Sequence, residues 1–446
     1  MSVKLLFPMP APEPMPAAPP TRPETARVLR PNRSQLVWEP RDLEAALRED
    51  HPARAIWGLL ERLDLSAFYG AIKAVLDRPG RPTTDPQVLL AVWLLATVEG
   101  IGSARQVTRL CTEHDAYRWL CGGVPINYHM LSDFRVAHRT ALDELLTQTV
   151  ASLLAAGAVT LMRVAQDGTR VRASAGASSF RRHTKLERCL EEARGQVTRL
   201  AEQREHPDPG VSKRQRAARE RAARERQKRV EQALALLPQA QAAKETQQQR
   251  YAKAERAKIT EPRTSTTDPE ARVMKMGDGG FRPAANVQFA TDQSCGVIVG
   301  MAVTASGSDV GQAVPMVEQI EQRTGQRPRD YLMDGGFAAR DDITDLEQGG
   351  ITVYAPVRLP KSKPEAERYA PRYGDSAEVI GWRGRMATDE AKTVYRQRAA
   401  TAEWTNAQAK LHGLSPFTVR GLAKMTTVVL LVAVAHNLLR WISLGL

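Results

Sequence analysis

Residues 159–174 read VTLMRVAQDGTRVRAS. An apolar run rich in β-branched residues leads to Asp167, and an alternating pattern resumes after Gly168. This pattern predicts a strand that ends at Asp167, a turn at Gly168 and a second strand. The stretch decides the fold because strand patterns begin here, after a long helical region. It also sets a carboxylate at the end of a strand, which is a rigid support for a functional group.

Strand and helix patterns alternate after this stretch. ANVQFATDQSCGVIVGMAVTAS at 285–306 predicts a hairpin that turns near Gln293 and Ser294. A helix then ends at Gly325, DYLMD at 330–334 predicts a short strand, and a second helix follows. ITVYAPV at 351–357 predicts another strand, and 389–446 is helical. This order predicts a mixed α/β sheet with helices on its faces.

The region before the sheet divides into an arm and a helical domain. Residues 1–38 are rich in Pro and Ala, which predicts a disordered arm. Residues 39–157 are helical and include one long helix that begins near Ser132 or Asp133. Short helices with exposed Arg can place one helix in a DNA groove, or they can form a bundle that only packs or dimerises. The spacing leaves both alternatives open.

The sheet domain, predicted at 158–446, is interrupted by a basic segment at 177–263. Between Arg181 and Arg263 the chain has 22 Lys and Arg against 12 Asp and Glu, so most of its excess positive charge lies here. Sparse apolar stripes on two polar helices, joined at HPDPG, predict an inserted helical hairpin. Its charge is either a solvated face or a surface that lies on DNA phosphates without reading sequence.

Composition narrows the class of protein. A net charge of +13 and an isoelectric point near 9.8 indicate a polyanionic partner. The four cysteines form no C-x-x-C pair, which argues against a zinc site, and a disulfide framework is not expected at this length. The longest apolar run near the carboxyl terminus, Val428 to Ala435, is too short to span a bilayer. We therefore expect a soluble cytoplasmic protein with no membrane partner.

Three acidic residues on distant segments are the candidate site: Asp167, Asp334 and Glu403. Carboxylates suit hard divalent cations, and Mg²⁺ (or Mn²⁺) is the expected ion. Two such ions can clamp the attacking and leaving oxygens of a phosphodiester. Arg396, Glu403 and Lys410 are spaced by seven residues, so they fall on one stripe of a helix. Glu403 would then help to hold the metal, with Arg396 or Lys410 on a phosphate oxygen.

Several motifs together resemble DDE-type insertion-sequence transposases, whose catalytic core is ribonuclease-H-like. The resemblance spans about residue 40 to 441 and rests on these stretches: GIGSARQVTRL…LSDFRVAH, QDGTRVRA, STTDPEARVMK, GSDVGQAVPMVEQI, YLMDGGF and AHNLLR. It implies that the three acids are the metal-binding triad. It also maps the Tyr-Arg-Glu-Lys signature of the family to Tyr395, Arg398, Glu403 and Lys410. The gap from Arg398 to Glu403 is one residue longer than in the best-known form, which leaves open whether Arg396 or Arg398 contacts phosphate.

The resemblance implies an enzyme that cuts double-stranded DNA at the ends of its element and joins the strands to a target. Because two ends must be held together, we expect a homo-oligomer, at least a dimer on DNA. Three alternatives remain at this stage. They are a DNA-binding or regulatory protein that has lost catalysis, a coiled-coil interaction protein, and a hydrolytic nuclease without strand transfer. No Walker-type phosphate loop is present in the sequence to support an ATP-driven reaction.

Overall fold

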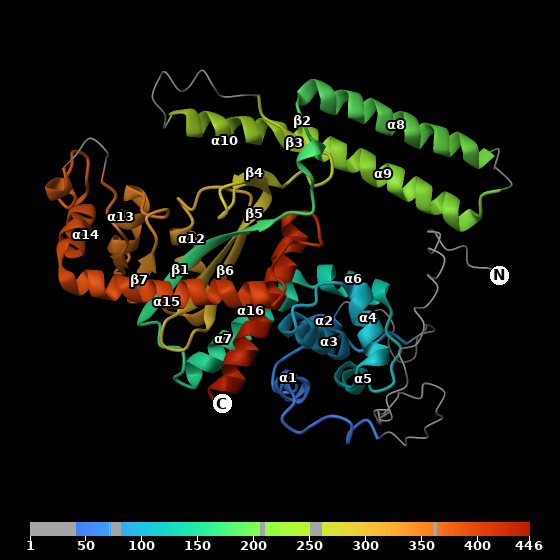
Figure 1. Ribbon diagram of the computed structural model, residues 1–446, viewed down its shortest axis with the longest axis horizontal. Coiled ribbons are helices and arrows are strands. Elements are labelled where there is room, and N and C mark those ends of the chain that lie inside the picture. The colour runs from blue at the N-terminus through green and yellow to red at the C-terminus, as the bar shows by residue number, and fades with distance from the viewer. Residues whose placement is uncertain (1–41, 71, 73–81, 206–209, 250–260, 360–363) are drawn as a thin grey trace, which may run out of the picture. The chain divides into compact units, whose positions relative to one another are not determined.

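The computed structural model describes residues 42–70, 72, 82–205, 210–249, 261–359 and 364–446 (Figure 1). The arm predicted at 1–38 lies outside these residues. From Leu43 to Leu446 the chain forms one unit. Its helices and its sheet share one hydrophobic core, so packing alone draws no boundary at residue 157. The domain limits proposed from the sequence therefore stay predictions about function.

Six of the described strands form a mixed sheet around β1 (Arg163–Arg172). β1 is antiparallel to β5 (Phe281–Asp292) on one side and parallel to β7 (Asp330–Met333) on the other. β8 (Thr352–Tyr354) continues the parallel side, while β4 (Arg272–Lys275) and β6 (Ile298–Thr304) both pair antiparallel with β5. The mixed α/β class, the β5–β6 hairpin and the strand at 330–334 are confirmed.

β1 runs through Gly168 without a break, so the turn predicted at this position is wrong. Gly168 pairs with Gln288 of β5, and the side chain of Asp309 lies over it. A Cβ atom at this position would stand 2.4 Å from Gln288 Nε2 and 2.7 Å from Asp309 Oδ1. Glycine is required here because polar side chains approach the backbone too closely to leave room for a Cβ atom.

Helices from the second half of the chain cover the sheet. α15 (Asp389–Leu411) contacts β1, β5, β7 and β8, and Figure 1 shows it lying across the strands. Its Ala402 is buried against Ala165 of β1 and Leu332 of β7. α12 (Ala313–Thr324) ends at Gly325 as predicted and packs on β6. α13 (Arg340–Gln348) and α14 (Ala377–Ala387) pack beside β8, and a short 3-10 turn (Glu365–Glu367) precedes α14.

The first part of the described chain is helical, as predicted. The helices are α1 (Pro52–Leu60), α2 (Ser66–Tyr69), α3 (Pro86–Val98), α4 (Ala104–Glu113), α5 (Asp115–Cys121), α6 (Tyr128–Ala137) and α7 (Arg139–Ala155). Side-chain caps at Asp85 and Ser103 start α3 and α4 where the sequence indicates. The single long helix predicted from Ser132 is wrong. The chain breaks at His138, whose ring packs on Phe68 and Phe134.

The last helix, α16 (Leu422–Ser443), joins the helical region to the sheet. It packs on α3, α7 and β6 and is largely buried. Among the described residues it is the one helix long and apolar enough by length and composition to cross a membrane, and most of it is buried inside the protein. Burial on several sides is a sufficient reason for its apolar composition.

The basic insertion forms the predicted helical hairpin. α8 (His183–Glu205) and α9 (Lys213–Ala235) lie side by side, and α10 (Leu237–Gln249) continues from α9 (Figure 1). A small cluster of Leu186, Ala233 and Leu237 packs at the base of the hairpin. The hairpin joins the sheet domain beside a 3-10 turn (Ala177–Ser179) and the paired strands β2 (Phe180–Arg181) and β3 (Thr264–Ser265).

Candidate active site

Asp167 lies in the middle of β1, beneath α15. Arg398 Nη2 donates to its Oδ1 at 2.8 Å, and Asn406 Nδ2 donates to its Oδ2 at 2.9 Å. Burial raises the pKa of Asp167 above its usual value, and the charge of Arg398 opposes that rise. The nearby Asp334 and Asp309 raise the pKa of Asp167 further, because their carboxylates disfavour another negative charge. The three aspartates therefore form one electrostatic cluster.

Asp334 follows directly after β7, the parallel neighbour of β1. Because Gln166 of β1 pairs with Met333 of β7, the next residues in each strand, Asp167 and Asp334, come to the same level of the sheet. The two aspartates are thus brought together as the sequence predicts. A Cβ atom on Gly336 would lie 2.7 Å from Asp334 Oδ1 and 3.4 Å from Asp309 Oδ2, so these two carboxylates converge on the same glycine.

Asp309 is the acidic residue that the sequence reasoning missed. It lies in the loop between β6 and α12, and its Oδ1 accepts hydrogen bonds from Asn286 Nδ2 and Gln288 Nε2, both at 2.7 Å. Arg170 Nη2 approaches its Oδ2 at 3.3 Å. The motif GSDVG marks this loop in the sequence, but nothing in the motif indicates that its carboxylate returns to β1 and β5.

The inner face of α15 carries Tyr395, Arg398, Ala402 and Asn406. Tyr395 lies near Arg398 and both aspartates; burial is the main cause that raises the pKa of its hydroxyl, and the charges of Asp334 and Asp167 add to it. Asn406 is buried, and its Oδ1 has no hydrogen-bond partner. Two of the four signature residues, Tyr395 and Arg398, are therefore close to the carboxylates.

The other predicted residues of α15 lie on its outer face. Arg396, Glu403 and Lys410 share one stripe, as their spacing indicates, but all three are exposed. Successive residues turn about 100° around a helix. Ala402 faces the sheet, so the next residue, Glu403, does not. The structure does not bring Glu403 to Asp167 and Asp334. Within the described ranges, no group of three or more His, Cys, Asp or Glu has an arrangement that could hold a metal ion.

The donor set around Asp167 nevertheless suits a divalent cation in part. The carboxylates of Asp167 in β1 and Asp334 just after β7 offer oxygen ligands, and the amide oxygen of Asn406 is buried without a partner. Oxygen donors of this kind are the ligands of Mg²⁺ and Mn²⁺. Asp167 and Asp334 are the carboxylates nearest to such a position; in this conformation Arg398 and Asn406 donate to both oxygens of Asp167, and Glu403 lies on the outer face of α15.

Two neighbouring carboxylates, an arginine and a tyrosine on the covering helix, and a basic chain are features that suit a class of enzymes, those that work on phosphodiesters. Comparison with known proteins narrows that class. Residues 41–137 match a family described as a transposase domain (DUF772), and residues 374–442 match a transposase DDE domain. Together the two matches identify the chain as an insertion-sequence DDE transposase, a DNA-binding enzyme of transposition.

The two matched segments cover different parts of the site. The DDE match includes α15 and therefore Tyr395, Arg398 and Glu403, whereas Asp167 and Asp334 lie between the two segments. DDE transposases generally use a divalent metal. No curated protein and no solved structure matches the chain.

Proposed function

We propose that this transposase cuts DNA at the ends of its element and joins the cut strands to a target at Asp167 and Asp334. One observation carries the proposal: residues of the matched DDE segment, Arg398 and Asn406, contact Asp167, and Asp334 lies near Asp167, directly after the neighbouring strand β7. The sheet around them is proposed to be a ribonuclease-H-like core. The arrangement of an antiparallel side, a central β1 and a parallel side supports that assignment.

The proposed cofactor is Mg²⁺ (or Mn²⁺), held by Asp167 and Asp334. When bound, the ion would neutralise developing charge and activate the attacking oxygen. Before the ion binds, Arg398 and Asn406 hold the Asp167 carboxylate in place, and Arg398 opposes the effect of burial on the pKa of Asp167. α15 covers the aspartates, which limits the access of bulk water.

Glu403 remains the proposed third ligand, on the condition that α15 turns. A rotation by about one residue, roughly 100°, would replace Ala402 by Glu403 on the inner face. The same rotation would withdraw Arg398 and Asn406 from Asp167 and leave its oxygens free for the ion. Arg396 and Lys410 are proposed to contact DNA phosphates, since both are exposed on the same helix. On this proposal, the conformation described above, with Ala402 on the inner face of α15, is the resting state of the enzyme.

The remaining assignments concern partners. Helices of 39–157 are proposed to help recognise the element ends, and the basic hairpin at 177–263 to lie on the DNA backbone. A homo-oligomer, at least a dimer, would hold two ends at once, and the cytoplasm is the proposed compartment. The match of residues 41–137 to a transposase domain supports the first of these roles.

The test is a nicking and strand-transfer assay on element-end duplex with Mg²⁺. Asp167→Ala, Asp334→Ala and Glu403→Ala should each bind DNA but nick it more than about 100-fold more slowly, a loss that follows even from disturbing groups that only support metal ligands. Glu390→Ala, another exposed acid on α15, is the matched control and should cut like the wild type.

Each alternative outcome has a distinct meaning. If Glu403→Ala cuts normally, α15 does not turn and Glu403 leaves the site. Binding without cutting by the wild type would favour a regulatory protein that has lost catalysis. Nicking with no joined product would favour a hydrolytic nuclease.

A further inference from the structure

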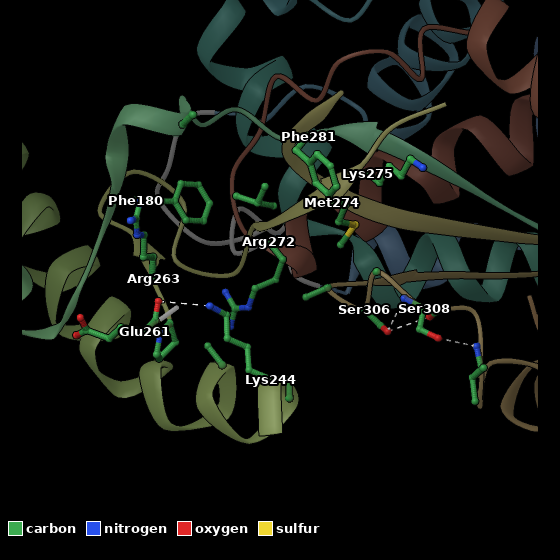
Figure 2. Close-up of a pocket in the computed structure, with 18 residues that line it drawn as sticks. Phe180, Lys244, Glu261, Arg263, Arg272, Met274, Lys275, Phe281, Ser306 and Ser308 are labelled. Carbon is green, nitrogen blue, oxygen red and sulfur yellow. Dashed lines mark hydrogen bonds between the residues drawn. The ribbon is translucent and has the colours of Figure 1, made fainter. Parts of the chain in front are cut away.

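A hollow of about 1040 Å³ lies between α10 of the basic hairpin and the edge strand β4 (Figure 2). Its walls come from segments far apart in the sequence: the turn before α8, the chain that enters β3, the start of β5 and the loop 305–310. It has the volume of a ligand cleft, which holds molecules the size of one or a few nucleotides rather than a duplex.

Positive charge predominates in this hollow. Four of its lining residues are cations and one is an acid; the cations are Lys244, Arg263, Arg272 and Lys275, and the acid is Glu261. Arg272 Nη1 donates to the backbone oxygens of Pro269 and Ala271, which fixes where its guanidinium lies. In Figure 2, Lys244 from α10 and Arg272 from β4 extend toward the same space. Two cations that face the same space, as Lys244 and Arg272 do (Figure 2), repel one another, and an anion between them relieves that repulsion.

The hollow also presents an aromatic side chain to solvent. Phe281, at the start of β5, lines it and is 69% exposed. Exposed single apolar residues are common on proteins, but this one borders a basic cleft. An aromatic face beside backbone-binding cations is the combination that holds unpaired nucleotides, because each base can stack while its phosphate is bound.

The hollow adjoins the aspartate cluster across one loop. Ser306, Ser308 and Val310 line the hollow, and Asp309 of the same loop turns the other way, toward Asn286 and Gln288. Arg170 ties this loop to β1, because its Nη2 donates to the oxygen of Gly307 at 3.0 Å. A strand bound in the hollow would therefore lie against the loop that carries Asp309.

We propose that this hollow binds an unpaired end of a DNA strand, with its phosphates on Arg263, Arg272 and Lys275 and one base on Phe281. The inference rests on the proposed DNA cleavage and adds the form of DNA next to the site. A single stacking position, rather than a row, agrees with the low aromatic content of 5%.

The experiment compares binding of a blunt duplex with binding of the same duplex bearing a short unpaired tail, in a salt series without metal. The wild type should prefer the tailed DNA. Arg263→Ala combined with Lys275→Ala should lower the salt slope for tailed DNA by about 1.4, since each single-strand phosphate contact contributes about 0.7. Phe281→Ala should reduce the preference for the tail about fivefold or more, and Phe281→Trp should keep it, because stacking contributes about 1–3 kcal/mol per base.

The matched control is Arg214→Ala combined with Arg219→Ala, the same loss of charge on exposed positions of α9. It should change the slopes for blunt and tailed DNA equally. A wild type that binds both DNAs alike, or a hollow variant that behaves like the control, overturns the inference but leaves the proposed cleavage intact. A wild type that binds neither DNA overturns both. Nicking lost in Asp167→Ala, with the tail preference kept, separates the hollow from the catalytic carboxylates.

Discussion

Gly168→Ala tests whether the close packing over β1 maintains the carboxylate cluster. The added Cβ atom would lie 2.4 Å from Gln288 Nε2, 2.7 Å from Asp309 Oδ1 and 3.1 Å from Asn286 Oδ1. Gln288 and Asn286 are fully buried and Asp309 is nearly so, and none of them can swing into solvent. Overpacking a buried site costs about 1–3 kcal/mol. Weakening hydrogen bonds to a charged acceptor costs about 1.5–3 kcal/mol more.

We therefore expect Gly168→Ala to lower the free energy of unfolding by about 3 kcal/mol or more. The matched control is Gly381→Ala in α14, where a Cβ atom would meet no atom within 4 Å. The same substitution should stabilise the protein there by about 0.5–1 kcal/mol, because alanine favours the helix. Urea unfolding followed by circular dichroism measures both changes. Gly168→Ala within about 0.5 kcal/mol of the wild type would refute the reasoning.

Two further predictions concern charge. Arg398→Ala removes the partner of a mostly buried carboxylate and should lower the free energy of unfolding by about 3 kcal/mol near neutral pH. The double variant Arg398→Ala with Asp167→Asn should recover most of that loss. Urea unfolding measures both changes. The pKa of Asp167 is higher in the folded protein than in the unfolded chain. The contribution of Asp167 protonation to folding stability is therefore complete below the usual carboxyl pKa, and it is lost as pH rises through the pKa of Asp167 in the folded protein. Removing Arg398 raises that pKa further, so the cost should shrink in acid; an equal cost at pH 7 and pH 4 would contradict this account. Replacing several arginines between Arg214 and Arg229 should reduce the salt slope of duplex binding if the hairpin lies on phosphates, and an unchanged slope would make it a solvated face.

Local patterns predicted much of the fold because local chemistry determines those features. Apolar runs bounded by Gly predicted the β5–β6 hairpin and β7, and the caps at Asp85 and Ser103 predicted the starts of α3 and α4. Two errors came from contacts between distant residues. The sequence near Gly168 does not show that Asp309 will lie over it. The sequence near His138 does not show that Phe68 will pack on its ring, where one helix ends and the next begins.

The candidate site follows the same division, and α15 shows why. Spacing alone placed Arg396, Glu403 and Lys410 on one stripe correctly, but spacing does not say which stripe faces the protein. An apolar stripe usually settles that question. The inner face of α15 instead carries Arg398, Ala402 and Asn406, because it covers a carboxylate as well as a small apolar cluster. A helix that serves a charged site therefore loses the pattern that would reveal its orientation. The one-residue difference between Ala402 and Glu403 then decides whether a third carboxylate meets Asp167 and Asp334 at rest, or only after the helix turns.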